Sequence, residues 1–329
     1  MRRPLVVFAV SVVVFTVLWR GDWHVAPALA EPTDESATGT LRRNARVILI
    51  TLDGPVRDDV FSSVAMPKLH AALSAKKGVL LEGRAASSMA LSLPGYQALA
   101  TGVVTDCLDN DCPRVGQETV SEFLARRLGG PVDQFAVFAS WSRLRRAATS
   151  HDGAVLVDAP DDTTPKPGGP RWRNARFDSQ TFDAALAHWQ RVKPRFLQIS
   201  FLDTDEWAHA GFREEYEEAL READTRVAQV MDWIDALPPE EKAVTTLIIT
   251  ADHGRGRADW REHGFFERGS GETFFAAFPA RGVSEARVVD QRDVRPTIER
   301  LFGFCTEGRR RRGEGRPLSV VVGELPCAE

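Results

Sequence analysis

Short apolar stretches rich in β-branched residues alternate along the chain with longer segments of helical periodicity. The most hydrophobic stretches are typical of strands buried on both faces of a sheet, and they cover residues 46–52, 135–140, 196–202 and 245–250. The amphipathic segments predict helices at 118–127, 179–191, 214–237 and 293–302, with Pro238 and Pro239 ending the third. This alternation predicts a three-layer α/β/α sandwich around a mostly parallel sheet.

The first thirty residues have the pattern of a signal peptide. Arg2 and Arg3 precede an uncharged run at 5–18, and Ala28-Leu29-Ala30 offers a cleavage site. The run is short for a membrane span, although an uncleaved anchor that would contact the membrane is the alternative. We therefore divide the chain into a signal peptide at 1–30, a flexible segment at 31–45 and one catalytic domain at 46–329, exported to the periplasm or secreted.

Composition narrows the class of protein. The 329 residues are 43% hydrophobic and carry a formal net charge of -4, which excludes a disordered chain and a collagen-like one. A nucleic-acid polymer is not expected as partner, because such proteins are usually strongly basic. A small molecule is the expected partner. The oligomeric state stays open.

Four cysteines in an exported protein favour disulfides over metal thiolates. Three pairings are conceivable, and proximity in sequence favours Cys107 with Cys112 and Cys305 with Cys327. Neither pair has the C-x-x-C spacing of a zinc knuckle. Four free buried thiols are the alternative.

Acidic residues and histidines follow the carboxyl ends of three expected strands, where open parallel sheets bind their ligands. The side chains that could hold divalent metal are Asp53, Asp205, His209, Asp252, His253 and His263. Six ligands are too many for one catalytic ion and suit two, as in-line displacement at phosphorus uses. Asp205 and His209 would share one face of a helix, and Asp203 is the alternative to Asp205.

Ser92 is the candidate nucleophile. It precedes an expected helix with Pro94 in the first turn and Gly102 at the C-cap. Free backbone N–H groups at such a helix start favour a phosphate anion, and a nearby metal would ionise the hydroxyl. An ordinary N-cap serine is the alternative reading.

Together these blocks resemble the alkaline phosphatase superfamily, nearest to its nucleotide pyrophosphatase/phosphodiesterase branch. The resemblance covers most of the chain and rests on ordered motifs: Leu-Asp-Gly at 52–54, Ser-x-Pro-x-Tyr at 92–96 followed by Thr-Gly at 101–102, Asp-x-x-x-His at 205–209, Asp-His-Gly at 252–254, His263, and the start of a last helix at 293–297. It implies one metal site made by Asp53, Ser92, Asp252 and His253, and a second made by Asp205, His209 and His263. Both ions would be zinc, with manganese as the alternative.

The departures from that family concern the substrate. The nucleotide enzymes usually carry threonine as nucleophile and asparagine three residues later, where this chain has Ser92 and Gly95. Sulfatases carry arginine where this chain has Tyr96. We therefore expect Gly95 and Tyr96 at the substrate, with Arg255 and Arg257 as anion contacts and Trp207 as a stacking surface, although packing against the sheet explains Trp207 as well. The Arg309–Arg312 run is expected to be solvated.

The resemblance implies a two-metal hydrolase of phosphoric monoesters or diesters that passes through a phosphoseryl intermediate on Ser92. Two alternatives remain at this stage. One is a sulfatase-like hydrolase of the same superfamily, and the other is a metal-containing protein that binds an anionic ligand without turnover.

Overall fold

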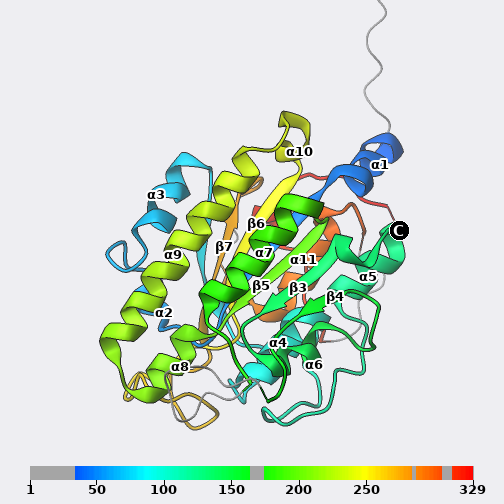
Figure 1. The fold of residues 1–329 in the computed structure, drawn as a ribbon. Coiled ribbons are helices and arrows are strands. Elements are labelled where there is room, and N and C mark those ends of the chain that lie inside the picture. The colour runs from blue at the N-terminus through cyan, green and yellow to red at the C-terminus, as the bar shows by residue number, and fades with distance from the viewer. Residues whose placement is uncertain (1–33, 164–173, 284–286, 306–312, 329) are drawn as a thin grey trace, which may run out of the picture. The chain divides into compact units, whose positions relative to one another are not determined.

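The computed structural model describes residues 34–163, 174–283, 287–305 and 313–328. One mixed sheet lies at its centre, with the strand order β4-β3-β5-β1-β6-β7-β2-β8 (Figure 1). The strands are β1 Arg46–Leu52, β2 Val79–Arg84, β3 Phe135–Ala139, β4 Leu156–Asp158, β5 Phe196–Phe201, β6 Thr245–Ala251, β7 Glu272–Phe278 and β8 Val289–Asp290. Only β7 runs antiparallel to its neighbours β6 and β2, so the predicted, mostly parallel sheet is confirmed.

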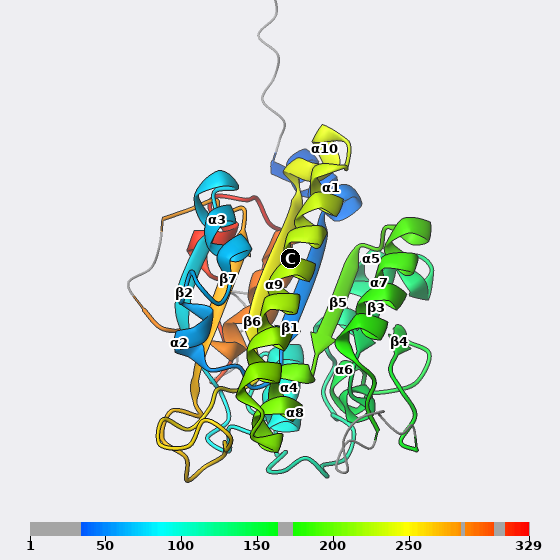
Figure 2. The same cartoon turned by 60° about the vertical axis from the view of Figure 1, so that its left-hand side comes forward.

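Helices cover both faces of this sheet (Figure 2). The α-helices are α1 Asp34–Asn44, α2 Arg57–Val60, α3 Pro67–Ala75, α4 Ser92–Thr101, α5 Val120–Leu128, α6 Arg145–Ala148, α7 Asp178–Val192, α8 Asp203–Ala210, α9 Arg213–Asp235, α10 Pro239–Ala243, α11 Val294–Leu301 and α12 Ser319–Val322. The described residues also form the short 3₁₀ turns η1 Val132–Gln134, η2 Ser142–Leu144 and η3 Gln291–Asp293. The four strands and four helices expected from the periodicity are all present.

Alternating side chains of the central strands supply two separate cores. Val47 and Leu49 of β1 pack in the cluster that includes residues of α4, α5, α6, α11 and α12. Ile48, Ile50 and Leu52 pack in the other cluster with residues of α3, α7 and α9. Because successive strand residues face opposite ways, a strand with helices on both sides must be apolar throughout. This confirms the three-layer architecture.

The segment expected to be flexible at 31–45 is ordered over its greater part. Residues 34–44 form α1, in which Thr38 and Leu41 are buried. Arg42 donates to the carbonyl of Ala328 at 2.8 Å, and Arg195 donates to the carbonyl of Ala45 at 2.8 Å. Helix α1 therefore belongs to the same compact unit as the sheet. Hydrogen bonds to distant residues hold this helix in place, which local sequence could not indicate.

Both expected disulfides form. Cys107 and Cys112 lie 5.4 Å apart between their Cα atoms, and Cys305 and Cys327 lie 5.1 Å apart. The expected signal peptide at 1–30 and the arginine run at 309–312 lie outside the described residues. In the part that is described, no helix has the length and apolar character needed to cross a membrane.

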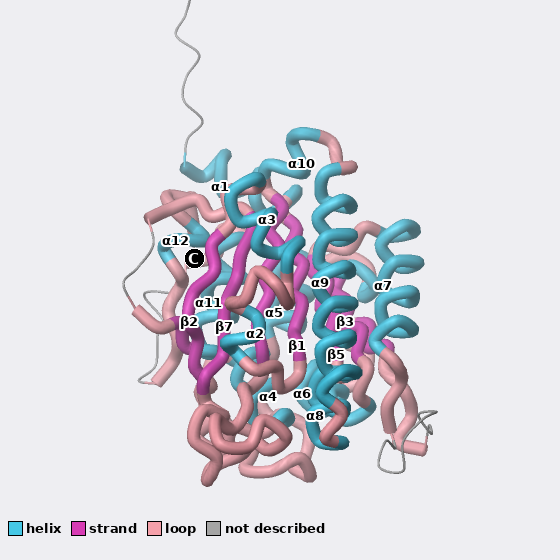
Figure 3. The backbone as a smooth tube through the Cα atoms, turned by 90° about the vertical axis from the view of Figure 1, so that its left-hand side faces the viewer, coloured by secondary structure: helices cyan, strands magenta, loops and turns pink. Residues whose placement is uncertain are grey.

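The carboxyl ends of β3, β5, β1 and β6 meet at one edge of the sheet, because these strands are parallel. Long connections gather there (Figure 3), including the loop between β6 and β7 (Figure 2). This edge carries the acidic residues, the histidines and Ser92.

Candidate metal centre

Three strands deliver the carboxylates of the candidate site. Asp53 follows β1, Asp252 follows β6, and Asp205 lies in the first turn of α8, which starts after β5. All three are at most 6% exposed. Carboxylates this deeply buried destabilise the fold unless they are paired or bind a metal. Three of them in one place therefore require nearby positive charge.

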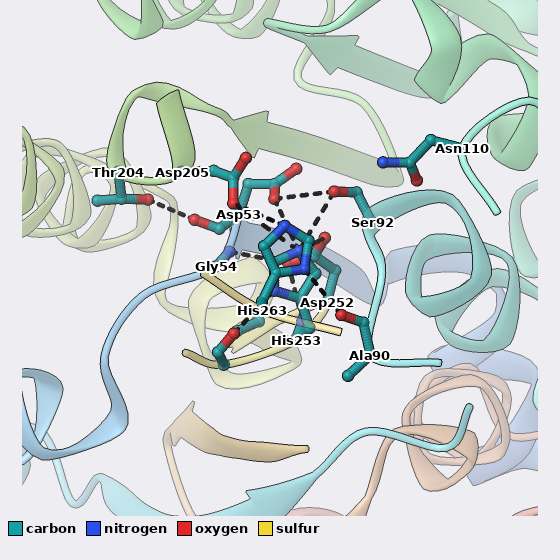
Figure 4. A network of polar contacts seen from close by, with 12 residues as sticks. Asp53, Gly54, Ala90, Ser92, Asn110, Thr204, Asp205, Asp252, His253 and His263 are labelled. Carbon is teal, nitrogen blue, oxygen red and sulfur yellow. Dashed lines mark hydrogen bonds and ion pairs between the residues drawn. The ribbon is translucent and has the colours of Figure 1, made fainter. Parts of the chain in front are cut away.

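The seven predicted ligands fall into two groups. The acidic and histidine ligand atoms of Asp53, Asp252 and His253 lie within 4.8 Å of one another, and those of Asp205, His209 and His263 do so as well. The Ser92 hydroxyl lies beside the first group, 3.3 Å from Oδ1 of Asp53 and 3.2 Å from Nε2 of His253 (Figure 4). The structure thus brings the expected residues together in two groups, and their role as metal ligands stays a prediction.

Helical spacing explains the second group. Asp205 and His209 are four residues apart on α8, and Nε2 of His209 lies 3.4 Å from Oδ2 of Asp205. His263 reaches the same place from the loop after β6, with its Nε2 2.9 Å from Nε2 of His209 and 3.7 Å from Oδ1 of Asp205. The alternative ligand Asp203 turns away, because its Oδ2 accepts a hydrogen bond from the backbone N–H of Asp178.

Two histidines are oriented by backbone carbonyls. Nδ1 of His253 donates to the carbonyl of Gly254, and Nδ1 of His263 donates to that of Ala90, each at 2.9 Å. Protonation at Nδ1 leaves the lone pair on Nε2, which faces the carboxylates. This carbonyl partner is typical of metal-binding histidines.

The pKa values show the same preference for a cation. Burial raises the pKa of Asp53 to about 7, with the charge of Asp205 adding to the rise. Burial and the neighbouring Asp53 raise the pKa of Asp252 well above its ordinary value. Burial lowers the pKa of His253 to about 4 and that of His263 to about 3, so both imidazoles are neutral and able to bind metal at pH 7.

The donor set fits divalent metal. Among the described residues, Oδ2 of Asp53 and Oδ2 of Asp252 are buried without a hydrogen-bonding partner, whereas Oδ1 of Asp252 accepts from the backbone N–H groups of Gly54 and His253. One oxygen of Asp252 is therefore held by the protein while the other faces the site. Carboxylate oxygen and imidazole nitrogen together suit zinc and manganese.

Two glycines allow these groups to approach. Gly54 has φ of 50°, and a Cβ there would lie 2.6 Å from Oδ1 of Asp205. At Gly95 a Cβ would lie 2.3 Å from the carbonyl oxygen of Asp252. Gly95 thus lets α4 pack against the strand end that carries Asp252, a packing role that differs from the expected place at the substrate.

The other expected substrate contacts also have protein partners. Arg255 is 4% exposed and pairs with Asp205, while its Nε and Nη1 donate to the carbonyls of Gly54 and Arg261. Although burial tends to raise the pKa of Asp205, the Arg255 guanidinium lowers it below its ordinary value. Arg255 therefore positions a candidate ligand instead of pointing into open space.

The remaining three expected contacts lie at different depths. Tyr96 is 2% exposed. Burial, together with the charges of Asp53 and Asp252, raises the pKa of its hydroxyl well above the ordinary value of 10, so the hydroxyl stays protonated near these carboxylates in the core. Arg257 has a side chain that is 66% exposed and pairs with Glu272. Trp207 packs edge-on against Phe212, the residue before α9, with ring centroids 6.0 Å apart.

Sequence reasoning missed Asn110. Its Oδ1 accepts a hydrogen bond from the backbone N–H of Leu93 at 2.9 Å, and Figure 4 shows its side chain beside Ser92. The backbone N–H groups at the start of α4 were expected to be free. That of Leu93 instead donates to Asn110, Pro94 has no N–H group, and that of Gly95 donates to the carbonyl of Leu91. The position of Asn110 inside the Cys107–Cys112 loop was the only signal in the sequence.

A comparison with protein-family models found one match. A family model described as the Metalloenzyme superfamily matches residues 171–260, which include Asp205, His209, Asp252 and His253. No curated protein matches the sequence.

Solved structures share the fold. A phosphonate monoester hydrolase of Agrobacterium radiobacter is 16% identical with a TM-score of 0.59, over 85% of this chain and 77% of its own. A putative sulfatase from Bacteroides thetaiotaomicron is 13% identical with a TM-score of 0.59, over 85% and 75%. A protein in the alkaline phosphatase superfamily from Vibrio parahaemolyticus is 13% identical with a TM-score of 0.55, over 79% and 66%.

These matches confirm the resemblance to the alkaline phosphatase superfamily at the level of the fold. The narrower likeness to its nucleotide pyrophosphatase/phosphodiesterase branch stays a prediction.

Proposed function

We propose that this chain, a metalloenzyme with the fold of the alkaline phosphatase superfamily, hydrolyses phosphoric esters through Ser92. The observation that carries the proposal is the place of the serine hydroxyl, 3.3 Å from Asp53 and 3.2 Å from His253 at the start of α4. This hydroxyl contacts one group of candidate metal ligands and lies next to the second group. A hydroxyl in such a place is suited to attack an electrophilic centre.

The chain's own residues suggest the course of the reaction. Ser92 attacks phosphorus in line, the leaving group departs on the opposite side, and water then hydrolyses the phosphoseryl intermediate. Asp53 and His253 hold the hydroxyl in place. Divalent ions in the two groups would supply positive charge that lowers the pKa of the serine and balances charge developing on the phosphoryl oxygens.

Tyr96 supports the choice of phosphorus over sulfur. In the sulfatase motif an arginine at this position assists the modified nucleophile. Here the residue is a tyrosine buried beneath Asp53 and Asp252, and it offers no guanidinium to the nucleophile. Sulfate-ester hydrolysis is therefore the second candidate, favoured by the fold of the sulfatase neighbours.

Zinc, with manganese as the alternative, is the proposed metal, and export is the proposed localisation. The imidazole and carboxylate set supports the metal, and the two disulfides support an oxidising compartment. The proposed partner is a small phosphoester, monoester or diester, and no nucleic-acid polymer. Contact with a membrane is proposed only for a protein that keeps its N-terminal segment.

Metal removal tests this function. We expect protein purified from an oxidising compartment to contain about two ions per chain, and a chelator to abolish hydrolysis of aryl phosphate monoesters or diesters by removing charge from the site. Elemental analysis and turnover of aryl phosphate monoester, diester and sulfate provide the measurement. Bound metal with turnover of the sulfate alone would assign a sulfatase. A protein that turns over none of the esters after zinc or manganese is added would be the binding protein.

Asn110 is expected to assist at the nucleophile. Since its Oδ1 is fixed by Leu93, the amide nitrogen is left as a donor beside Ser92, able to bind a phosphoryl oxygen. We predict that Asn110→Asp, which keeps the acceptor for Leu93 and removes the donor, lowers kcat about 10²-fold.

Steady-state kinetics and metal content check the role of Asn110. Leu108→Ala in the same disulfide loop, where the side chain is 62% exposed, is the control and should keep wild-type kcat. Full activity in Asn110→Asp, with a loss only in Asn110→Ala, would show that Asn110 serves solely as a cap for Leu93.

A further inference from the structure

A second polar cavity lies outside the metal centre. Its volume is about 230 Å³, and half of its lining residues are arginines: it is formed by Arg114, Ser142, Arg143, Arg145, Arg146, Pro160, Asp161 and Asp162. The arginines are partly buried, whereas Asp161 and Asp162 are exposed. Among the side chains that line it, four are positive and two are negative.

The cavity and the metal centre share one edge of the sheet. Turn η2 and helix α6, which carry three of the arginines, follow β3, and the segment with Pro160 follows β4. The order β4-β3-β5-β1 places these strands directly beside those that carry Asp205 and Asp53. Because neighbouring strands lie about 4.8 Å apart, the ends of β3 and β1 are separated by about 10 Å. A ligand of modest length could reach both places.

Two of the arginines donate their hydrogen bonds to backbone carbonyls. Arg145 donates to the carbonyls of Val157 and Ala159, and Arg146 donates to those of Asp111 and Cys112. Carbonyls fix the guanidinium planes without neutralising them, and across the described residues neither arginine forms an ion pair.

The other two arginines pair only with exposed carboxylates. Arg143 pairs with Asp111, whose side chain is 79% exposed, and Arg114 pairs with Asp152, whose side chain is 90% exposed. Such pairs are weak in water. Fixed, partly buried guanidinium groups are the usual ligands of tetrahedral oxyanions.

Asn110 connects this cavity to the nucleophile. Nη1 of Arg143 donates to the Asn110 carbonyl at 2.7 Å, while the Asn110 side chain accepts from Leu93, the residue after Ser92. Helix α4 also packs directly against α6, as Figures 1 and 2 show. The cavity wall and the start of α4 are thus held together as one unit through the disulfide loop.

We propose that the cavity binds a second phosphate- or sulfate-type group of the substrate, so that the ester attacked at Ser92 belongs to a molecule with at least two such groups. This inference rests on the proposed function. The second group would be held by the four arginines beside the strand ends that carry the metal centre, and it would contribute to substrate affinity more than to the chemical step.

Matched substrates and variants test the second subsite. The substrates are alkanediol bisphosphates of graded chain length and alkyl monophosphates of the same lengths. The variants are Arg145→Gln/Arg146→Gln, the charge-retaining Arg145→Lys/Arg146→Lys, and Arg221→Gln/Lys242→Gln, which removes two charges from exposed side chains. Thermal melting checks that each variant folds.

We expect wild-type protein to prefer the bisphosphate of matching length about tenfold in kcat/KM, mainly through KM. The preference should disappear in the glutamine variant, remain in large part in the lysine variant, and be unchanged in the surface variant. Hydrolysis of a simple aryl phosphate should be the same in all of them. Equal kcat/KM for the two substrate series in wild type, or a preference that survives in the glutamine variant, would overturn the subsite.

Calorimetric binding to Ser92→Ala protein separates this inference from the proposed function, because it needs no turnover. Tighter binding of the bisphosphate than of the monophosphate, lost in Ser92→Ala/Arg145→Gln/Arg146→Gln, supports the subsite even if no ester is hydrolysed. Inorganic phosphate serves as a third ligand. Arginine-dependent binding of phosphate, without any advantage for the bisphosphate, would make the cavity a separate phosphate site and refute a substrate subsite.

Discussion

Ser92→Ala is expected to lower kcat for phosphoester hydrolysis by at least about 10³-fold, because it removes the nucleophile. The Ser92 side chain is almost fully buried and makes its contacts with Asp53 and His253. These two residues stay in place when the hydroxyl is removed, so bound metal should change little. The decisive measurements are turnover of an aryl phosphate and elemental analysis of the same preparation.

The covalent step has its own signature. Acid quenching of wild-type protein during turnover should leave a phosphoryl group on the peptide that contains Ser92, detectable by mass spectrometry, and the alanine variant should lack it. Ser74→Ala on the exposed side of α3 is the matched control. A variant that keeps the wild-type rate without Ser92 would rule out this serine as nucleophile.

Asp252→Asn is expected to have the second largest effect. Asp252 is fully buried, and its Oδ1 accepts from the backbone N–H groups of Gly54 and His253. An asparagine preserves that acceptor and the side-chain size but removes the negative charge that would bind metal. We predict the loss of about one of the two ions and a fall in kcat/KM of about 10³-fold, because both the charge and the position of the nucleophile depend on the metal.

Alanine at this position would change both metal binding and the stability of the fold. It would leave two buried N–H groups without an acceptor, at a cost of about 1–3 kcal/mol each in stability. Asparagine therefore separates metal binding from folding, and circular dichroism melts verify this. Asp232→Asn, an exposed carboxylate on α9, is the control. Full metal content in Asp252→Asn would exclude this carboxylate as a ligand.

The sequence by itself determined the sheet and its two helical layers. Strands β1, β3, β5 and β6 are buried on both faces, which requires an apolar residue at nearly every position and makes them easy to recognise. It also determined the candidate ligands, since acids directly after parallel strands must meet at one edge. The order of strands β7, β2 and β8 was not visible, because β2 is partly exposed and lacks a continuous apolar run, and β8 has only two residues.

Only the tertiary structure decided what each polar side chain contacts. Arg255 was expected at the substrate and instead pairs with Asp205, while Asn110 was not expected and lies beside Ser92. Both depend on contacts between residues that are far apart in sequence, 50 positions in the first case and 17 between Asn110 and Leu93 in the second. The sequence therefore determined which chemical groups reach the edge of the sheet, and the packing of α4, α8 and the disulfide loop determined which of them face the reacting atoms and which hold others in place.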